Sequence, residues 1–175
     1  MILKGEKVIL RQIRLSDAKR FVKWLYDPRV NKFMSGRPVS MQEELRWIRG
    51  LKKKKDNKAF AIDTGDGTHI GSINLLLKPH DKKAVLGVMI GDKRYWNKGY
   101  GTDALKTIIR YGFIRLRLHR ISLEVYEYNP RAIRVYRRLG FRIEGRGREA
   151  RRYKGKFYDD IVMGLLRREW FKKQG

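Results

Sequence analysis

Apolar and polar residues recur along this chain at two periods, which predict strands separated by helices. Helical spacing predicts helices that begin at Ser16 and Ser40 and helices that span 102–116 and 130–139. The order β-α-α-β-β-β-α-β-α-β-β implies one α/β (α+β) domain over residues 1–175, with a mixed sheet and helices on its faces. Alternating or continuous apolar runs predict the strands 7–13, 60–63, 69–78, 84–90, 120–126, 141–152 and 158–166.

Short polar motifs predict where several of these elements begin and end. Ser16-Asp17 is predicted to cap the first helix. Ser40 and Glu43 stand at the spacing of a capping box. Gly140 follows the last predicted helix at the position that favours a left-handed backbone. The segment 79–81 is short enough to join its flanking strands as a hairpin.

The charge of the chain is strongly positive. Lys and Arg number 43 against 18 Asp and Glu, which gives a net charge of +25 over 175 residues. This excess is typical of a polyanionic partner such as ribosomal RNA near the substrate, or of a phosphate-bearing ligand. Solubility, or ion pairing in a heat-adapted protein, is the alternative, although the acids are too few to pair most of the bases.

Composition also excludes several kinds of chemistry. There is no cysteine, so disulfides, thiolate metal sites and a cysteine nucleophile are excluded. No apolar run approaches the ~20 residues of a membrane helix, and no apolar signal region follows the first charges. We therefore expect a cytoplasmic protein without a membrane partner.

A glycine-rich turn between a predicted strand and a predicted helix is the strongest candidate for a binding site. The run 96–102 reads Trp-Asn-Lys-Gly-Tyr-Gly-Thr. Free N–H groups and the helix dipole make such a turn an anion site, and glycines let a phosphate approach the backbone. The two glycines also fit a merely structural turn. The Walker A sequence is absent, and the dinucleotide fingerprint lacks its repeated βαβ half.

The turn and a later helix together resemble a known enzyme family. Positions 96–101 follow the pattern Gln/Arg-x-x-Gly-x-Gly/Ala, with Trp96 as a departure at the first position. Asn129, Tyr136 and the sequence Leu-Gly-Phe at 139–141 match the same family's second half. The chain thus resembles the GCN5-related N-acetyltransferase (GNAT) superfamily, most closely its ribosomal-protein and diamine acetyltransferase branch. The resemblance covers nearly the whole chain and implies a mixed, mostly antiparallel sheet and the co-substrate acetyl-CoA.

The resemblance also assigns residues to the co-substrate. The backbone of Met89, Ile90 and Gly91 would hold the pantetheine and acetyl end. Asn129 would hydrogen-bond the cofactor arm, and its alternative is an N-cap for the following helix. The pyrophosphate would bind at Asn97, Lys98, Gly99, Tyr100, Gly101 and Thr102.

Two further side chains are candidates for proton transfer. Tyr136 would protonate the departing thiolate, with a packing role as its alternative. Glu124 would remove a proton from the amine, with an arginine salt bridge as its alternative, and Glu127 or water is held in reserve. Direct attack in a ternary complex is expected, because no cysteine is present to carry the acetyl group. No metal site is expected, because the three histidines are scattered.

The acceptor amine is the open question. The leading hypothesis is a protein N-terminal α-amine, as on a ribosomal protein. A polyamine or aminoglycoside is the alternative, and a non-catalytic RNA-binding module on the same fold is a third hypothesis; a monomer and a homodimer both remain open. A small polycation would be repelled at long range. It would bind only if acids converge locally, and the candidates are Asp27, Glu43, Glu44, Asp159 and Asp160.

Overall fold

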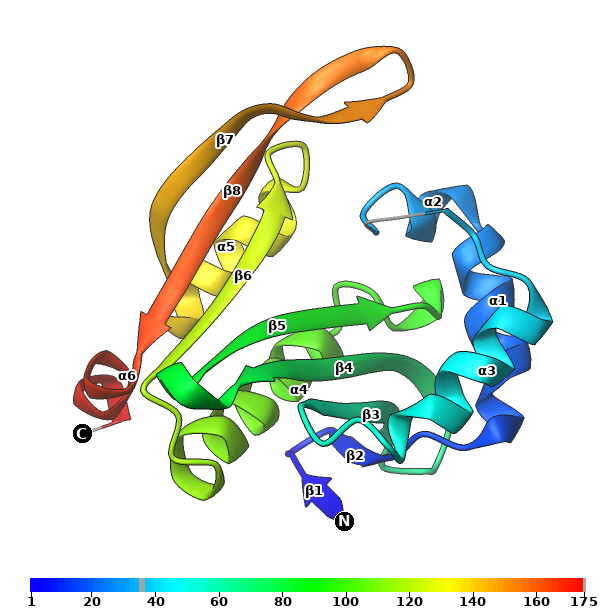
Figure 1. Ribbon diagram of the computed structural model, residues 1–175, viewed down its shortest axis with the longest axis horizontal. Helices are drawn as coiled ribbons and strands as arrows, with labels where there is room; N and C mark the ends of the chain where they lie inside the picture. Colours follow the sequence, from blue (N-terminus) through cyan, green and yellow to red (C-terminus); the bar gives the residue numbers. More distant parts are fainter. Residues whose placement is uncertain (35–36, 175) are drawn as a thin grey trace.

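Eight strands form one sheet that parts into two arms near its middle (Figure 1). The computed structural model describes residues 1–34 and 37–174. The strands run in the spatial order β1-β2-β3-β4-β5-β6-β8-β7, and every pair is antiparallel except β5 with β6. Their bounds are β1 Ile2–Lys4, β2 Val8–Gln12, β3 Asn57–Thr64, β4 His69–Lys78, β5 Lys83–Ile90, β6 Arg120–Tyr126, β7 Arg142–Tyr153 and β8 Lys156–Leu166.

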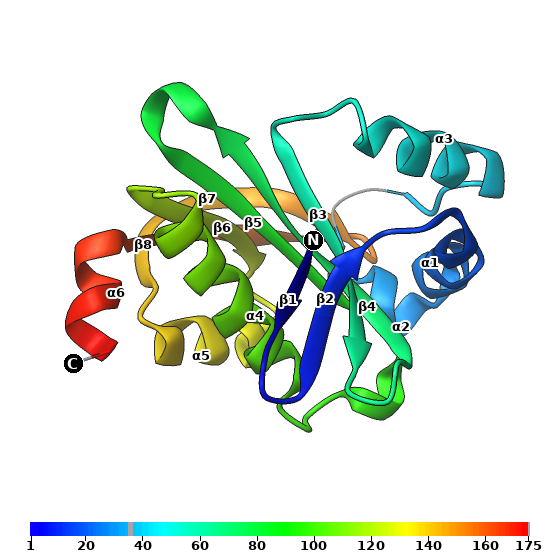
Figure 2. The same cartoon turned by 90° about the horizontal axis from the view of Figure 1, so that it is seen from below.

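Helices cover both faces of the sheet (Figure 2). One face carries α4 and α5, and the other carries α1 and α3 over the arm that contains β2 to β5. A π-helical turn at Tyr111–Arg115 continues α4, and a 3-10 turn at Leu15–Asp17 precedes α1. The helices are α1 Ala18–Tyr26, α2 Pro28–Asn31, α3 Met41–Leu51, α4 Tyr100–Arg110, α5 Pro130–Leu139 and α6 Arg167–Gln174.

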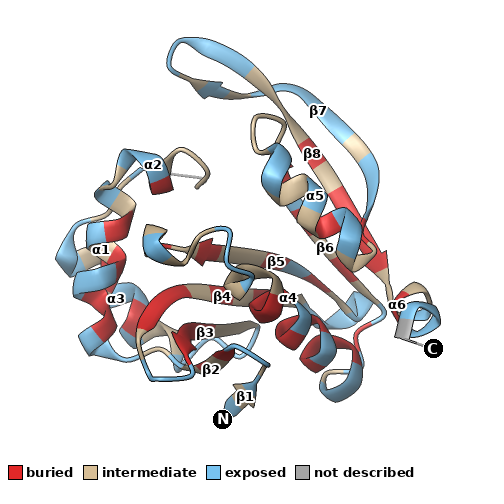
Figure 3. Cartoon of the chain, turned by 180° about the vertical axis from the view of Figure 1, so that it is seen from behind, coloured by how far each residue is buried: buried red, intermediate tan, exposed pale blue. Residues whose placement is uncertain are grey.

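Two apolar clusters hold these layers together. The larger one lies between the sheet and the α4/α5 layer, and it includes side chains from β5, β6 and β8 alike. The smaller one joins α1 and α3 to the end of β5 through Phe21, Ile48 and Met89. Figure 3 shows that β7 is mostly exposed along its length, so the β7–β8 hairpin extends beyond both clusters.

Most of the predicted elements are confirmed. The predicted bounds of β4, β6 and α5 agree with the structure at both ends. The capping box of α3 is also confirmed: the Glu43 N–H donates to Ser40 Oγ over 3.2 Å, and the Ser40 N–H donates to Glu43 over 2.8 Å. The mixed, mostly antiparallel sheet is as expected.

The predicted cap of the first helix is wrong. No side chain caps α1 at Asp17, and the chain enters the helix through the 3-10 turn. Asp17 is buried, and its carboxylate instead accepts hydrogen bonds from the Arg11 guanidinium and from the Arg14 N–H. Burial alone raises the pKa of Asp17, but these hydrogen bonds outweigh it and lower the pKa. Asp17, in a sequence typical of a helix cap, therefore forms a buried ion pair with Arg11.

Three elements were not predicted, and others differ at their ends. β1, α2 and α6 are short, and α6 is so charged that only Trp170 reaches the core. The predicted strand 60–63 extends to Asn57–Thr64. The helix predicted at 102–116 starts two residues earlier and gives way to the π-helical turn after Arg110. Elements this short carry too few periodic positions to be recognised.

Asp103 fixes the start of α4 against the β1–β2 turn. Its carboxylate accepts three backbone hydrogen bonds, from the N–H groups of Glu6 (3.2 Å), Lys7 (2.8 Å) and Val8 (3.0 Å). The side chain is buried in the first turn of the helix, where a negative charge also complements the helix dipole. One carboxylate thus sets the position of the glycine turn that precedes α4.

We predict that Asp103→Ala lowers the free energy of unfolding by about 3 kcal/mol, because it leaves the buried Val8 N–H and the part-buried N–H groups of Glu6 and Lys7 without an acceptor. Asp103→Asn keeps one oxygen for Lys7 and Val8 and should cost about 1 kcal/mol. Urea denaturation of both variants measures the difference. Equal losses in the two variants would contradict the role given to the accepted hydrogen bonds.

Candidate active site

The opening between β5 and β6 is the central feature of the candidate site. The two strands pair over only three positions, Lys83–Val85 with Arg120–Ser122, and then diverge (Figure 1). The N–H of Gly91 donates to the Ile70 carbonyl, which continues the β4–β5 ladder. Because hydrogen bonding alternates along an antiparallel pair, Met89 faces β4 and the backbone groups of Val88 and Ile90 face the opening. The opening therefore offers a strand edge to an extended ligand.

The three residues predicted to hold the acetyl end differ in what they can offer. Ile90 has its N–H on the open edge, and its carbonyl accepts a hydrogen bond from the Trp96 indole. Met89 lines a cavity that lies between the sheet and the helices α1 and α3. Gly91 has a packing reason to be glycine, because an added Cβ would lie 2.1 Å from the Trp24 ring. The place of Val88 on the open edge was not predicted, because nothing in the sequence distinguishes this residue from other strand residues.

The glycine turn lies at the far end of β5 and leads into α4. Gly99 is the N-cap residue, with φ at +86°, a left-handed backbone that favours glycine. The first N–H groups of α4, from Tyr100 to Thr102, have no intrahelical partner, which is the arrangement that can bind an anion at a helix N-terminus. Gly101 lies close to β5, since an added Cβ would be 3.4 Å from Ile90 Cγ1. The predicted pyrophosphate residues are thus brought together at the edge of the opening.

Trp96 and Arg131 connect this turn to the start of α5. The Trp96 indole donates to the Ile90 carbonyl over 2.7 Å, and the Arg131 guanidinium lies 5.0 Å from the indole ring centre. Arg131 also donates to Asn97 Oδ1 over 3.1 Å. Trp96, the departure from the family pattern, therefore has a structural role. Arg131 was missed, because a single arginine among 43 basic residues carries no sequence signal.

Asn129 caps α5, as its alternative interpretation proposed. Its Oδ1 accepts a hydrogen bond from the Ala132 N–H over 3.2 Å, with Pro130 in the first turn. Its amide Nδ2 is the group that remains for a cofactor contact. The cap places the N-terminus of α5, like that of α4, beside the bridge that Trp96 and Arg131 form.

Glu124 and Asp160 bring two carboxylates to one face of the second arm of the sheet. Glu124 is exposed on β6, on the face away from the larger apolar cluster. Asp160 is paired with Tyr126 on β8, so the two acids are diagonal neighbours. Burial raises the pKa of Asp160, and the Glu124 charge adds to the rise. Asp160 Oδ1 is buried without a hydrogen-bond partner among the described residues.

Glu127, the reserve base, is used structurally. Its carboxylate accepts hydrogen bonds from the Asp159 N–H over 2.9 Å and from Arg146 over 3.3 Å. These bonds tie the end of β6 to the β7–β8 hairpin. The structure therefore leaves Glu124 as the better candidate base of the two.

Tyr136 lies inside the core on the opposite side of β6 from Glu124. Its side chain is 8% exposed and packs edge-on against Phe141, with ring centres 5.9 Å apart. Burial raises the pKa of Tyr136 to about 12, so the phenol keeps its proton at neutral pH. Tyr136 therefore has the packing role that was its alternative interpretation. Its hydroxyl is also protonated, which is the form that a proton donor needs.

The described residues contain neither a metal-binding cluster nor a membrane-spanning helix. Within 1–34 and 37–174, no group of three or more His, Asp or Glu side chains is placed to hold a metal ion. No helix in those ranges is long and apolar enough to span a bilayer. His69 is buried between the Phe21 and Trp24 rings, with ring centres 5.1 and 5.0 Å away.

Comparison with known proteins gives a consistent family. The domain described as "Acetyltransferase (GNAT) domain" matches residues 7–142. The uncharacterized N-acetyltransferase p20 of Bacillus licheniformis is 28% identical, over 96% of this chain and 97% of that protein. YdaF of Bacillus subtilis, a proposed ribosomal N-acetyltransferase, is also 28% identical, over 92% and 86%. A chimera of the Vibrio cholerae spermidine N-acetyltransferase SpeG and hSSAT has the same fold, with a TM-score of 0.86 at 22% identity over 94% of this chain and 98% of that one.

We predict that Gly99→Ala raises the dissociation constant for acetyl-CoA about tenfold, because a Cβ strains the left-handed turn and disturbs its N–H groups. Gly67→Ala is the matched control, since Gly67 has φ at +85° in the distant β3–β4 turn with open space around it. Both variants should lose about 1 kcal/mol of stability, and only Gly99→Ala should lose affinity. Calorimetric titration and urea denaturation measure the two effects. An equal loss of affinity in both variants would show that the effect comes from stability.

Proposed function

Because this chain belongs to the GNAT acetyltransferase family and is an acetyl-CoA-dependent acetyltransferase, we propose that its acceptor is the α-amine of a protein N-terminus. The single observation that carries this proposal is the opening between β5 and β6, together with the cavity that Met89, on the open part of β5, helps to line. The strand edge and the two helix N-termini are suited to the pantetheine arm and the phosphates. The cavity has room for a side chain next to the reacting amine.

The acids of the surface favour a protein α-amine over a polyamine. Of the five acids that would have to converge on a polycation, Asp27 is paired with Lys93, Glu43 with Arg37 and Asp159 with Arg146. Glu44 and Asp160, which form none of the ion pairs found among the described residues, belong to different elements, α3 and β8. The remaining field is strongly positive and suits an acceptor on a negatively charged assembly, as the name of the relative YdaF also proposes for that protein.

The proposed reaction is direct acyl transfer. The neutral amine nitrogen attacks the thioester carbonyl carbon, and Glu124 takes the proton that the nitrogen loses. The C–S bond then breaks, and the Tyr136 hydroxyl gives its proton to the departing thiolate. The proton on Glu124 returns through solvent to Tyr136, so the products are the amide and free coenzyme A. An N–H on the open edge of β5 would stabilise the oxyanion of the intermediate.

We expect acetyl-CoA turnover with peptides that carry a free α-amine, and none with spermidine, an aminoglycoside or a peptide whose only amine is a lysine side chain. Release of the coenzyme A thiol measures the rate, and mass spectrometry locates the acetyl group. Turnover with spermidine alone would overturn the α-amine assignment. Acetyl-CoA binding without turnover on any amine would point to a larger acceptor, such as an assembled ribonucleoprotein.

We predict that Tyr136→Phe lowers kcat about 100-fold while the KM for acetyl-CoA changes little, because only the proton donor is lost. Glu124→Gln should lower kcat/KM for the amine by a similar factor. Steady-state kinetics over a range of pH measures both. The alkaline limb of the wild-type profile should not come from Tyr136, since the raised pKa keeps it protonated across the mildly alkaline range. A larger loss in Glu127→Gln than in Glu124→Gln would move the base to Glu127.

A further inference from the structure

A cavity of about 360 Å³ lies beneath α1 and α3, on the side of β5 that faces these helices. Met89 forms part of its wall, so the cavity adjoins the place where the acetyl group is expected. Most of its wall is apolar and comes from the first arm of the sheet and the helices that cover it. Its apolar and aromatic lining residues include Ile13, Phe21, Leu25, Met34, Trp47 and Met89.

Glu44 places a carboxylate in this apolar wall. Glu44 lies in the first turn of α3, and the residue is only 6% exposed. No Lys, Arg or His nitrogen of the described residues lies within the 4.0 Å of an ion pair, whereas its neighbour Glu43 is paired with Arg37. Burial raises the pKa of Glu44. A buried carboxylate without a partner is costly, and a cation that enters the cavity would remove this cost.

Asn31 adds a buried amide donor to the same wall. Its Nδ2 is buried and has no hydrogen-bond partner among the described residues. An unsatisfied buried donor is as unusual as an unpaired carboxylate. The other charged groups of the wall, Arg37 and Glu43, neutralise each other in an ion pair, and Ser72 and Asn74 add polar groups. The cavity therefore combines an apolar surface with one acid that has no cationic partner and one free amide donor, which suits a molecule with an apolar stem, a cationic end and a carbonyl.

We propose that this cavity holds the first side chain of the acceptor, and that Glu44 selects a side chain whose apolar stem ends in an ammonium or guanidinium group. The proposal rests on acetyl transfer to a peptide α-amine and names the peptides that this site prefers. Phe21, Leu25 and Trp47 contact the stem, Glu44 pairs with the cation, and Asn31 Nδ2 donates to the carbonyl of the first residue.

The overall charge of +25 does not oppose this selection within the cavity. Repulsion between exposed charges is screened beyond about 8 Å at physiological salt, whereas Glu44 acts at contact and away from water. A linear diamine shares the stem and the cationic end, but it has no carbonyl for Asn31. The free amide donor of Asn31 therefore favours a peptide over a diamine as the ligand of this cavity.

The test is the binding of acceptors to the complex of the full chain with coenzyme A, measured by calorimetry so that no turnover is needed. Two peptides differ only in their first residue, lysine or norleucine, and 1,5-diaminopentane is the third ligand. Wild type should bind the lysine peptide about 10- to 100-fold more tightly than the norleucine peptide. In Glu44→Gln this ratio should fall to about one, with the affinity for the norleucine peptide unchanged.

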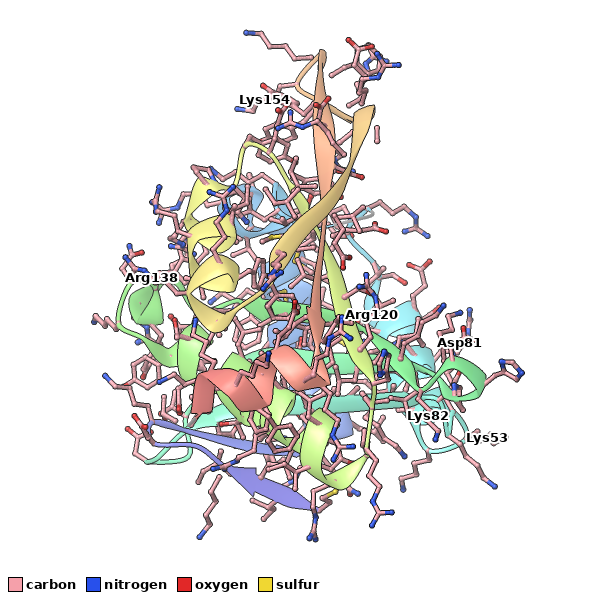
Figure 4. All side chains as sticks on the ribbon, turned by 90° about the vertical axis from the view of Figure 1, so that its left-hand side faces the viewer. Lys53, Asp81, Lys82, Arg120, Arg138 and Lys154 are labelled. Atoms are coloured by element: carbon pink, nitrogen blue, oxygen red, sulfur yellow. The ribbon has the colours of Figure 1, made fainter. Side chains whose placement is uncertain are left out.

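Asp81→Asn is the matched control for charge. It removes one negative charge at the exposed turn between β4 and β5, where Figure 4 shows Asp81 beside Lys82 at the edge of the molecule, and it should keep the wild-type ratio. Asn31→Ala should weaken both peptides by a similar factor and leave the diamine unchanged. Unchanged affinity for coenzyme A confirms that each variant is folded.

Three results would overturn the proposal. Equal wild-type affinity for the two peptides, or a lysine preference that survives Glu44→Gln, would remove Glu44 as the selecting group. Tighter binding of the diamine than of either peptide would make a small diamine the ligand and refute the peptide assignment. Failure of the proposed function is a separate result, because selective binding with no acetylation of any peptide would contradict the α-amine assignment and leave the selection intact.

Discussion

The structure depends on how far β5 and β6 remain paired. They share three residue pairs and then separate, so that the rest of β5 has an edge without a neighbouring strand. In an ordinary sheet these N–H and C=O groups would be satisfied by the next strand, and exposed edges of this kind are ready to accept an extended chain. Because β5 and β6 do not pair beyond these residues, a binding site is available in the middle of an otherwise continuous sheet.

Side-chain packing holds the two arms together where the backbone does not. Leu86 on β5 and Val125 on β6 belong to one apolar cluster with the buried face of α4, so the arms share a core although their ladders have parted. At the open end, Trp96 and Arg131 join the turn before α4 to the start of α5. Both helix N-termini are thereby fixed beside the opening, and the two helix dipoles, with the uncapped N–H groups of α4, give it a positive potential without requiring a charged residue.

The acidic residues differ in burial and pairing, which the composition alone does not show. Most of those at the surface are paired with one of the abundant basic side chains, and Asp17, Asp63 and Asp103 are buried with guanidinium or backbone partners. Against this background, Glu44 is unusual because it is buried without such a partner among the described residues. A strongly basic protein can thus present a local acidic site, because what a ligand meets at contact is set by burial and pairing.

The sequence by itself determined the elements with long periodic patterns and the motifs with local rules. The bounds of β4, β6 and α5, the capping box at Ser40 and the glycine turn at Gly99 all follow from contacts within a few residues, which a sequence displays directly. Tertiary structure decided the rest. Asp17 looks like a helix cap until Arg11 and Asp63 are brought beside it. The parting of β5 and β6, the bridge from Trp96 to Arg131 and the isolation of Glu44 depend on residues far apart in the chain, and no local pattern encodes which of many similar side chains will meet.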